Sequence, residues 1–549
     1  MSSERLLNLA PWLLFSGSAL FLLLFNDSTM LYGLDETKNA QCAREMLMRG
    51  DWIVPTFNGQ LRTDKPPLHY FFMGLAYRLF GISEFSARFF SGIFGALTIL
   101  LTFGFGCRHL GTGAGWLSAL SLLASLHYSI QMRMSVPDPY LVFWMTGTSL
   151  AAFEGVETRQ KRWFYFAYVT AAFGMLTKGP VAVALPGLTL FLYITLTRQW
   201  SWALVRAAQL PVGILLWGVI ALPWYVAVHQ QTNGAWTDGF FFKHNLERFS
   251  APMEGHGGFF GLPLVFVLVG MLPFSVFLPI ALGRVWKVQT AHPLLTFCLL
   301  AAGVIVLFFM ASGTKLPNYT VPAYPFVALL LGFGLNDLYR RLPQRVVMSV
   351  TLATLMLITL LLPPAISLLL HDDLMLSDLW WLGLLFLPFP AGAMFSWFYW
   401  SRRNLNGVMG AMAVSWMACA WVLFGYAYGR VDARNPVVQL NHLIHNQPLV
   451  AYKLFNPAFV YYRQPVTRKA VPGLSEAQYR FLPVADPEQL SGLRIFDQPD
   501  SLRSFLTRHP YARVITRKEF LQEIETDSLP ILARQPDLFE RSVTVILGK

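Results

Sequence analysis

The chain alternates between long apolar runs and short polar junctions. Thirteen apolar runs approach or reach the ~20 residues that a helix needs to cross the hydrocarbon layer of a membrane. They lie near residues 8–26, 85–107, 111–130, 138–155, 163–177, 180–197, 208–229, 259–282, 294–311, 318–337, 346–369, 379–399 and 407–428. This pattern predicts a membrane-embedded, all-α domain of about thirteen transmembrane helices over residues 1–429.

Basic residues gather at every second junction between these runs. The junctions contain Arg108; Arg159, Lys161 and Arg162; Arg198 and Arg206; Arg284 and Lys287; Arg340, Arg341 and Arg345; and Arg402 and Arg403. Because loops rich in lysine and arginine stay in the cytoplasm, the alternation predicts a cytoplasmic N-terminus. An odd number of spans then places the C-terminal segment on the outer side of the membrane.

Composition supports a membrane protein and changes the meaning of the positive charge. Hydrophobic residues make up 55% of the 549-residue chain and charged residues only 13%, against about 25% charged in soluble domains. The formal charge of +12 would suit a nucleic-acid partner, but the basic residues sit in the junctions and form no binding face. We therefore expect no nucleic acid, and since no Walker-type loop is present we also expect no nucleotide.

Three polar segments interrupt the apolar pattern on the predicted outer side. Residues 27–84 and 230–258 are too long for simple turns, and the apolar side chains of 27–84 suit helices that lie in the membrane interface. Residues 430–549 are polar and rich in proline, with strand-like stretches at PLVAYKLF, AFVYYR, ARVITR and SVTVILGK and a helix-like stretch at KEFLQEIET. This segment is predicted to form a small periplasmic α/β domain.

Ionisable residues near a bilayer are costly, so those in the outer segments are candidates for function. Asp35 follows the first span and could deprotonate or position an acceptor, while Lys38 lies one helical turn further on; alternatively, Asp35 only caps a helix. Lys65 precedes two prolines that hold it extended, as suits a cation against a phosphate, although it could equally be an interfacial lysine. Asp138 precedes a proline and is either a helix cap or a second acid at the outer side.

The second outer loop and the turn TKLPNY supply further candidates. His256 and Asp64 could be two ligands of a divalent metal ion, but two loop residues distant in sequence also fit an ordinary surface histidine and carboxylate. Lys315 in the turn could simply extend to the membrane interface.

Taken in order, these motifs resemble a known family. The Asp-Glu pair after the first span, the later Lys-Pro-Pro, the aspartate at the fourth span, the HNLERF…H loop and the TKLPNY turn are similar to the bacterial aminoarabinose transferases of lipid A. The related polyprenyl-phosphomannose-dependent protein mannosyltransferases share the pattern. The resemblance implies a glycosyltransferase of the GT-C fold with a cavity open to the periplasm.

The resemblance also implies roles for individual residues. Asp35 would be the catalytic or acceptor-positioning acid and Asp138 a second acid. The donor phosphate would be held by Lys38, Lys65 and Tyr319, with Arg62 and Lys315 as further candidates. Asp64 and His256 match positions implicated in binding zinc or another divalent cation, although relatives often have glutamate in place of Asp64.

The expected reaction moves a sugar, 4-amino-4-deoxy-L-arabinose by the closest resemblance, from undecaprenyl phosphate to a lipid A phosphate. Attack opposite the leaving phosphate would invert the anomeric carbon, and fixed cations would stabilise the phosphate dianion that leaves. Two alternatives stay open: a glycosyltransferase acting on a protein or glycan hydroxyl, and a transporter of a lipid-linked sugar. Transporters often contain two similar halves, and no such repeat is visible.

Overall fold

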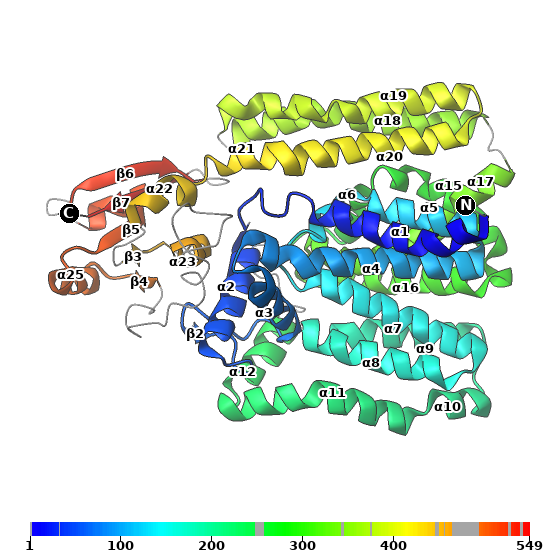
Figure 1. Cartoon of the computed structure of the whole chain (residues 1–549), viewed down its shortest axis with the longest axis horizontal. Helices are drawn as coiled ribbons and strands as arrows, with labels where there is room; N and C mark the ends of the chain where they lie inside the picture. Colours follow the sequence, from blue (N-terminus) through cyan, green and yellow to red (C-terminus); the bar gives the residue numbers. More distant parts are fainter. Residues whose placement is uncertain are drawn as a thin grey trace.

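The computed structural model describes the chain except for residues 1–2, 32, 248–256, 342–344, 374–375, 445–448, 455, 464–492, 525–528, 538–541 and 549. All thirteen predicted apolar runs are helical within it. Figure 1 shows most of these helices running side by side in one bundle, with a layer of smaller elements across one end and the C-terminal domain beyond that layer.

The first part of the bundle follows the expected order along the chain. Its elements are α1 (Ser3–Leu23), α4 (Glu84–Leu110), α5 (Thr112–Leu123), α6 (Leu126–Gln131), α7 (Asp138–Thr158), α8 (Lys161–Lys178), α9 (Val181–Leu196), α10 (Trp202–Ala208) and α11 (Leu210–Gln231). The second part contains α14 (Leu262–Gly270), η2 (Phe274–Phe277), α15 (Leu278–Val288), η3 (Gln289–Ala291), α16 (Pro293–Ala311), η4 (Pro317–Ala323), α17 (Tyr324–Arg340), α18 (Arg345–Leu368), η5 (Leu369–Asp373), η6 (Ser377–Phe386), α19 (Pro388–Ser401), α20 (Leu405–Val422), η7 (Leu423–Ala427) and α21 (Tyr428–Asp432).

Length and apolar composition identify a multi-pass membrane protein. Among the described residues, seven helices are long and apolar enough to cross a membrane, and an eighth is added if Leu262–Gly270 and Phe274–Ala291, which meet at 111°, form one broken span. Leu9–Leu23, Thr112–Leu123 and Val181–Leu196 are apolar but shorter. The total of thirteen spans therefore stays a prediction.

Small residues allow helices of the bundle to pack closely. A Cβ atom on Gly106 of α4 would lie 2.8 Å from the Cα atom of Gly115 in α5, and one on Gly334 of α17 would lie 2.4 Å from the Cβ atom of Ala281 in α15. Close approach of this kind replaces the hydrophobic driving force that lipid does not provide. Any larger residue at these positions would push the helices apart.

The outer segment 27–84 forms a compact layer at the end of the bundle. It contains α2 (Gly33–Arg49), the short antiparallel pair β1 (Thr56–Phe57) and β2 (Gln60–Leu61), and α3 (Leu68–Phe80). The two helices were predicted and the hairpin was not. The second outer segment adds α12 (Ala235–Asp238) and the π-helical turn η1 (Gly239–Glu247) to the same end (Figure 1).

The C-terminal segment is a small α/β domain, as predicted. Its elements are α22 (Pro436–Ile444), β3 (Leu449–Tyr452), α23 (Pro457–Arg463), β4 (Arg494–Phe496), α25 (Pro499–Arg508), β5 (Arg513–Arg517), η8 (Lys518–Glu523), β6 (Ile531–Pro536) and β7 (Val543–Leu547). The strands form one sheet in the order β4-β3-β5-β7-β6. Strand β3 is parallel to β4 and β5, whereas β7 is antiparallel to β5 and β6.

Three of the four predicted strands are confirmed as β3, β5 and β7. The fourth prediction was wrong, because AFVYYR lies in α23. Asn456 accepts a hydrogen bond from Ala458 N at 3.0 Å, and Pro457 is the first helical residue, where its missing N–H costs nothing. The predicted helix KEFLQEIET begins as the 3-10 helix Lys518–Glu523, and its last residues fall outside the described chain.

The C-terminal domain shares a hydrophobic core with the layer of α2 and α3. One cluster joins buried residues of that layer, such as Ala43, Met46 and Tyr77, to Phe459 and Ile546 of the domain. The domain therefore packs against the segment that contains most of the candidate site residues, rather than forming a separate body.

Candidate active site

A cavity of about 370 Å³ lies between the outer layer and helices of the bundle. Much of its wall is apolar and comes from helices of the bundle, including Leu141, Leu185 and Phe308. Its polar lining comes chiefly from residues outside or at the ends of those helices: Asp64, Lys65, Lys178, His244, Asn318 and Tyr319. The cavity thus offers charge and hydrogen bonds beside an apolar wall.

Asp138 lies directly behind this polar lining. Its Oδ1 atom accepts hydrogen bonds from Lys178 Nζ at 2.7 Å and from Asn318 Nδ2 at 3.2 Å. Its side chain is 4% exposed and that of Lys178 is 15% exposed. Asp138 is the first residue of α7, yet its carboxylate accepts hydrogen bonds from these two side chains and not from the backbone N–H groups at the start of its own helix. The expected capping role is therefore not the one seen.

Gly179 fixes the direction in which Lys178 enters the site. The residue ends α8 with φ of +82°, which side chains disfavour, and a Cβ atom there would lie 2.5 Å from the ring of Phe240. Phe240 itself lines the cavity. Glycine is thus required twice, by the backbone turn and by the close approach of Phe240.

Arg62 supports the site from below the cavity surface. Its side chain is 3% exposed, and its Nη2 atom lies 3.1 Å from Asp64 Oδ2 and 2.9 Å from Asn39 Oδ1. The indole of Trp236, from the second outer segment, donates to the Arg62 carbonyl at 2.9 Å. Arg62 does not line the cavity, so its guanidinium holds Asp64 rather than facing the open space.

The electrostatic field around Asp64 is strongly positive. Burial alone would raise the pKa of this carboxyl group, but Arg62, Lys65, His244 and Lys38 outweigh burial and hold the pKa below its usual value. Asp64 is therefore ionised throughout the physiological range. Lys38 does not line the cavity, yet it is close enough to act on the Asp64 charge.

The turn TKLPNY enters the site as the 3-10 helix η4 and the residues before it. The ring of Tyr319 packs 4.8 Å from that of Phe309 and lies 5.2 Å from Lys178 Nζ, centroid to atom. Lys315 instead donates from Nζ to the Ser312 carbonyl at 2.7 Å and does not line the cavity. Tyr319 and Asn318 are thus the residues of this turn that face the site.

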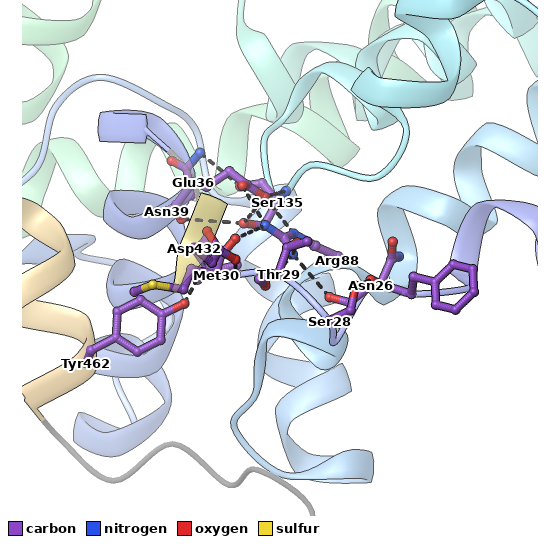
Figure 2. Close-up of polar contacts among 12 residues, drawn as sticks. Asn26, Ser28, Thr29, Met30, Glu36, Asn39, Arg88, Ser135, Asp432 and Tyr462 are labelled. Carbon is purple, nitrogen blue, oxygen red and sulfur yellow. Dashed lines mark hydrogen bonds and ion pairs between the residues drawn. The ribbon is translucent and has the colours of Figure 1, made fainter. Parts of the chain in front are cut away.

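Asp35 lies in the first turn of α2 and its side chain is exposed. Burial would lower the pKa of Arg62, but Tyr70 and Asp64 raise it, and the Asp35 charge adds a smaller effect in the same direction. The neighbouring Glu36 is 1% exposed and receives two hydrogen bonds from Arg88, Nε to Oε1 at 2.9 Å and Nη2 to Oε2 at 2.8 Å. Ser135 N also donates to Glu36 at 2.7 Å, so this carboxylate joins α2, α4 and the segment before α7 (Figure 2).

The structure brings Asp64, Lys65 and Tyr319 to one cavity, with Asp138 directly behind it. Arg62 and Lys38 lie in the same electrostatic environment, and Asp35 acts on Arg62. Sequence reasoning missed three residues, because Lys178, Asn318 and Arg88 were not singled out as candidates. The signal for Lys178 was a lysine next to Gly-Pro at the outer end of a span.

The predicted metal site is not tested by this geometry. His256 lies outside the described residues. Within the part of the chain that the structure describes, no group of three His, Cys, Asp or Glu side chains could hold an ion. His244 lines the same cavity as Asp64.

Comparison with known proteins agrees with this arrangement. Residues 64–226 match the family model described as dolichyl-phosphate-mannose-protein mannosyltransferase. An undecaprenyl phosphate-alpha-4-amino-4-deoxy-L-arabinose arabinosyl transferase of Aeromonas salmonicida is 31% identical over 349 residues, which is 62% of this chain and 62% of the relative. The transferase of the same description from Yersinia pestis is 28% identical over 354 residues, 60% of this chain and 61% of that one. The matches thus span about three fifths of these relatives' length.

Structural similarity extends over the whole chain. The crystal structure of ArnT from Cupriavidus metallidurans bound to undecaprenyl phosphate superposes with a TM-score of 0.78 at 24% identity and covers 98% of both chains. Its apo state gives a TM-score of 0.77 and covers 97% of both. The predicted GT-C fold is therefore confirmed.

Proposed function

We propose that this chain, which is similar over about three fifths of its length to undecaprenyl phosphate-aminoarabinose arabinosyl transferases, transfers a sugar from undecaprenyl phosphate to an acceptor outside the cytoplasm. The cavity is the observation that carries the proposal. Lys65 and Lys178 lie at its polar lining, beside an apolar wall that suits a prenyl chain. A prenyl phosphate has a charged head and an apolar chain, so its binding requires both the lysines and the apolar wall.

The two lysines would act on the leaving group. When the sugar departs, negative charge grows on the phosphate, and fixed cations in a partly buried site stabilise that charge more than water does. Asp138 holds Lys178 in place by the 2.7 Å ion pair. Tyr319, at the cavity lining, could donate a hydrogen bond to a phosphate oxygen.

Asp35 is the acid proposed to serve the acceptor. It is exposed and lies at the start of α2, which Glu36 and Arg88 fix to the bundle. An acceptor hydroxyl would need its carboxylate as a base, whereas an acceptor phosphate is already nucleophilic and would need only alignment. Either route inverts the anomeric carbon.

The proposed acceptor is a lipid A phosphate and the proposed sugar is 4-amino-4-deoxy-L-arabinose, the sugar in the names of the relatives. The proposed location is the bacterial inner membrane with the site facing the periplasm, supported by the alternating basic junctions. The match to the mannosyltransferase family model favours a second candidate, transfer to a protein or glycan hydroxyl.

One experiment separates these candidates. Purified protein is incubated with undecaprenyl phosphate-linked aminoarabinose and lipid A, and the products are analysed by mass spectrometry. Lipid A that gains one aminopentose supports the proposal, whereas sugar on a protein or glycan supports the second candidate. Donor that stays intact with every acceptor, in detergent and without a membrane gradient, contradicts both and favours transport.

A Lys65→Ala variant tests the cavity in the same assay. We expect weaker donor binding because a cation beside the phosphate is lost, and partial recovery in Lys65→Arg, which keeps the charge in a different shape. Lys243→Ala is the matched control, because Lys243 is exposed and does not line the cavity.

A further inference from the structure

The segment between α1 and α2 is held by elements from distant parts of the chain (Figure 2). On one side, Arg88 of α4 donates from Nη1 to the Asn26 and Thr29 carbonyls at 3.1 and 2.9 Å, and from Nη2 to the Met30 carbonyl at 2.6 Å. These bonds fix the carbonyl groups of the segment. Its N–H groups are held from elsewhere.

Two C-terminal residues receive the N–H groups of this segment. Met30 N donates to Asp432 Oδ2 at 2.7 Å, across 402 positions of sequence, and Leu31 N donates to the hydroxyl oxygen of Tyr462 at 2.7 Å, across 431. Asp432 ends α21 and is 6% exposed, while Tyr462 lies in α23 and is 8% exposed. Both bonds are buried, where water cannot replace them.

Other contacts extend the same attachment along the outer layer. Arg44 of α2 donates from Nη1 to the Tyr461 carbonyl at 3.2 Å, and Asn58 of the turn between β1 and β2 donates from Nδ2 to the Leu493 carbonyl at 2.9 Å. The shared core lies between these polar contacts. The C-terminal domain therefore touches α2 near its start, along its length and at the hairpin that follows.

We propose that Asp432, at the end of the last helix of the bundle, and Tyr462 of the C-terminal domain are positioning residues for the transferase site, which together set the place of Asp35. This inference rests on the proposed function for its kinetic part only. Asp35 comes four residues after Leu31, in the first turn of α2, so the bonds to Met30 N and Leu31 N lie next to the helix start that contains its carboxylate. A shift of about 1 Å at a reacting group costs on the order of 100-fold in rate.

The first test is hydrogen exchange in the full-length protein in detergent. Tyr462→Phe removes one oxygen atom and leaves the ring, so the domain should stay folded. We expect exchange in peptides covering Ser28–Asn39 to quicken roughly fivefold, the effect of losing about one net hydrogen bond. Tyr461→Phe is the matched control, because in the described chain the Tyr461 hydroxyl makes no hydrogen bond to residues 26–31.

The second test is kinetic. In Tyr462→Phe we expect kcat for transfer to fall by about tenfold or more while the KM for donor stays within about twofold, since the cavity lysines are untouched. Asp432→Asn keeps an oxygen acceptor for Met30 N and should lose less than Asp432→Ala. Unchanged exchange at Ser28–Asn39 in Tyr462→Phe would overturn the proposal, as would unchanged kcat in an active enzyme. If the parent transfers no sugar at all, the proposed function fails, and the exchange result still decides the attachment.

Discussion

Lys178 offers the sharpest test of the cavity, because its removal and the removal of its partner should act in opposite directions. In Lys178→Met the cation is lost, and Asp138, whose side chain is 4% exposed, keeps only the hydrogen bond from Asn318 at 3.2 Å. One hydrogen bond to a charged group contributes about 1.5–3 kcal/mol. Since each 1.4 kcal/mol changes an affinity tenfold, the donor should bind about 10- to 140-fold more weakly.

Asp138→Asn should show the reverse. The amide oxygen can still accept from Lys178, but the charge that neutralises the lysine is gone, so a lipid phosphate should bind more tightly. The assay is displacement of labelled undecaprenyl phosphate from purified protein in detergent, with size-exclusion chromatography to confirm that each variant is folded. Donor affinity of Lys178→Met within about twofold of the parent, with the exposed Lys243→Met as control, would show that the phosphate lies elsewhere.

Further predictions concern the acids, the topology and the metal. Asp35→Asn should abolish transfer while donor binding persists. Normal turnover by this variant at normal protein abundance would show that Asp35 only caps α2. Because the neighbouring cations outweigh burial and hold the pKa of Asp64 below its usual value, its carboxylate is present at neutral pH and is lost only as pH falls through that lowered pKa. Asp64→Asn should therefore leave the shape of the pH–rate profile between pH 5 and 8 unchanged, and a changed slope there would contradict the field described. A periplasm-dependent reporter should be active after Arg430 and inactive after Arg403; an inactive fusion after Arg430 would refute the odd number of spans. If a metal ion organises the outer loops, chelation or His256→Ala should lower activity. Metal analysis that finds no bound zinc, together with no effect of chelation, would reject the metal site.

Local patterns predicted what depends on local physics. Apolar runs predicted the helices of the bundle because a helix in lipid needs an apolar surface wherever it occurs in the chain. Asp64 and Lys65 were singled out as ionisable residues of an outer segment, whereas Tyr319 was implied by the family resemblance. Pairings across long distances in sequence were not predictable in this way. Asp138 contacts Lys178, which is 40 positions away in the sequence, and Asn318, which is 180 positions away.

The C-terminal domain shows the same limit. Aromatic and β-branched residues in AFVYYR favour a strand by propensity, but Asn456 and Pro457 start a helix whose Phe459 and Tyr461 enter the core shared with α2. Tertiary packing decided that this segment is a helix and not a strand, and a single sequence does not show which surface will cover such a segment.

The attachment of the first outer segment to the end of the chain has a consequence for biogenesis. Met30 leaves the ribosome 402 residues before its partner Asp432. At 5–20 residues per second, this separation corresponds to about 20–80 s of synthesis. During that interval the buried face of α2 has no C-terminal domain to cover it, so a chaperone of the outer compartment could bind there. A nascent or truncated chain would then insert its helices without completing the site, so that under the proposed function an incomplete chain would not use the lipid donor.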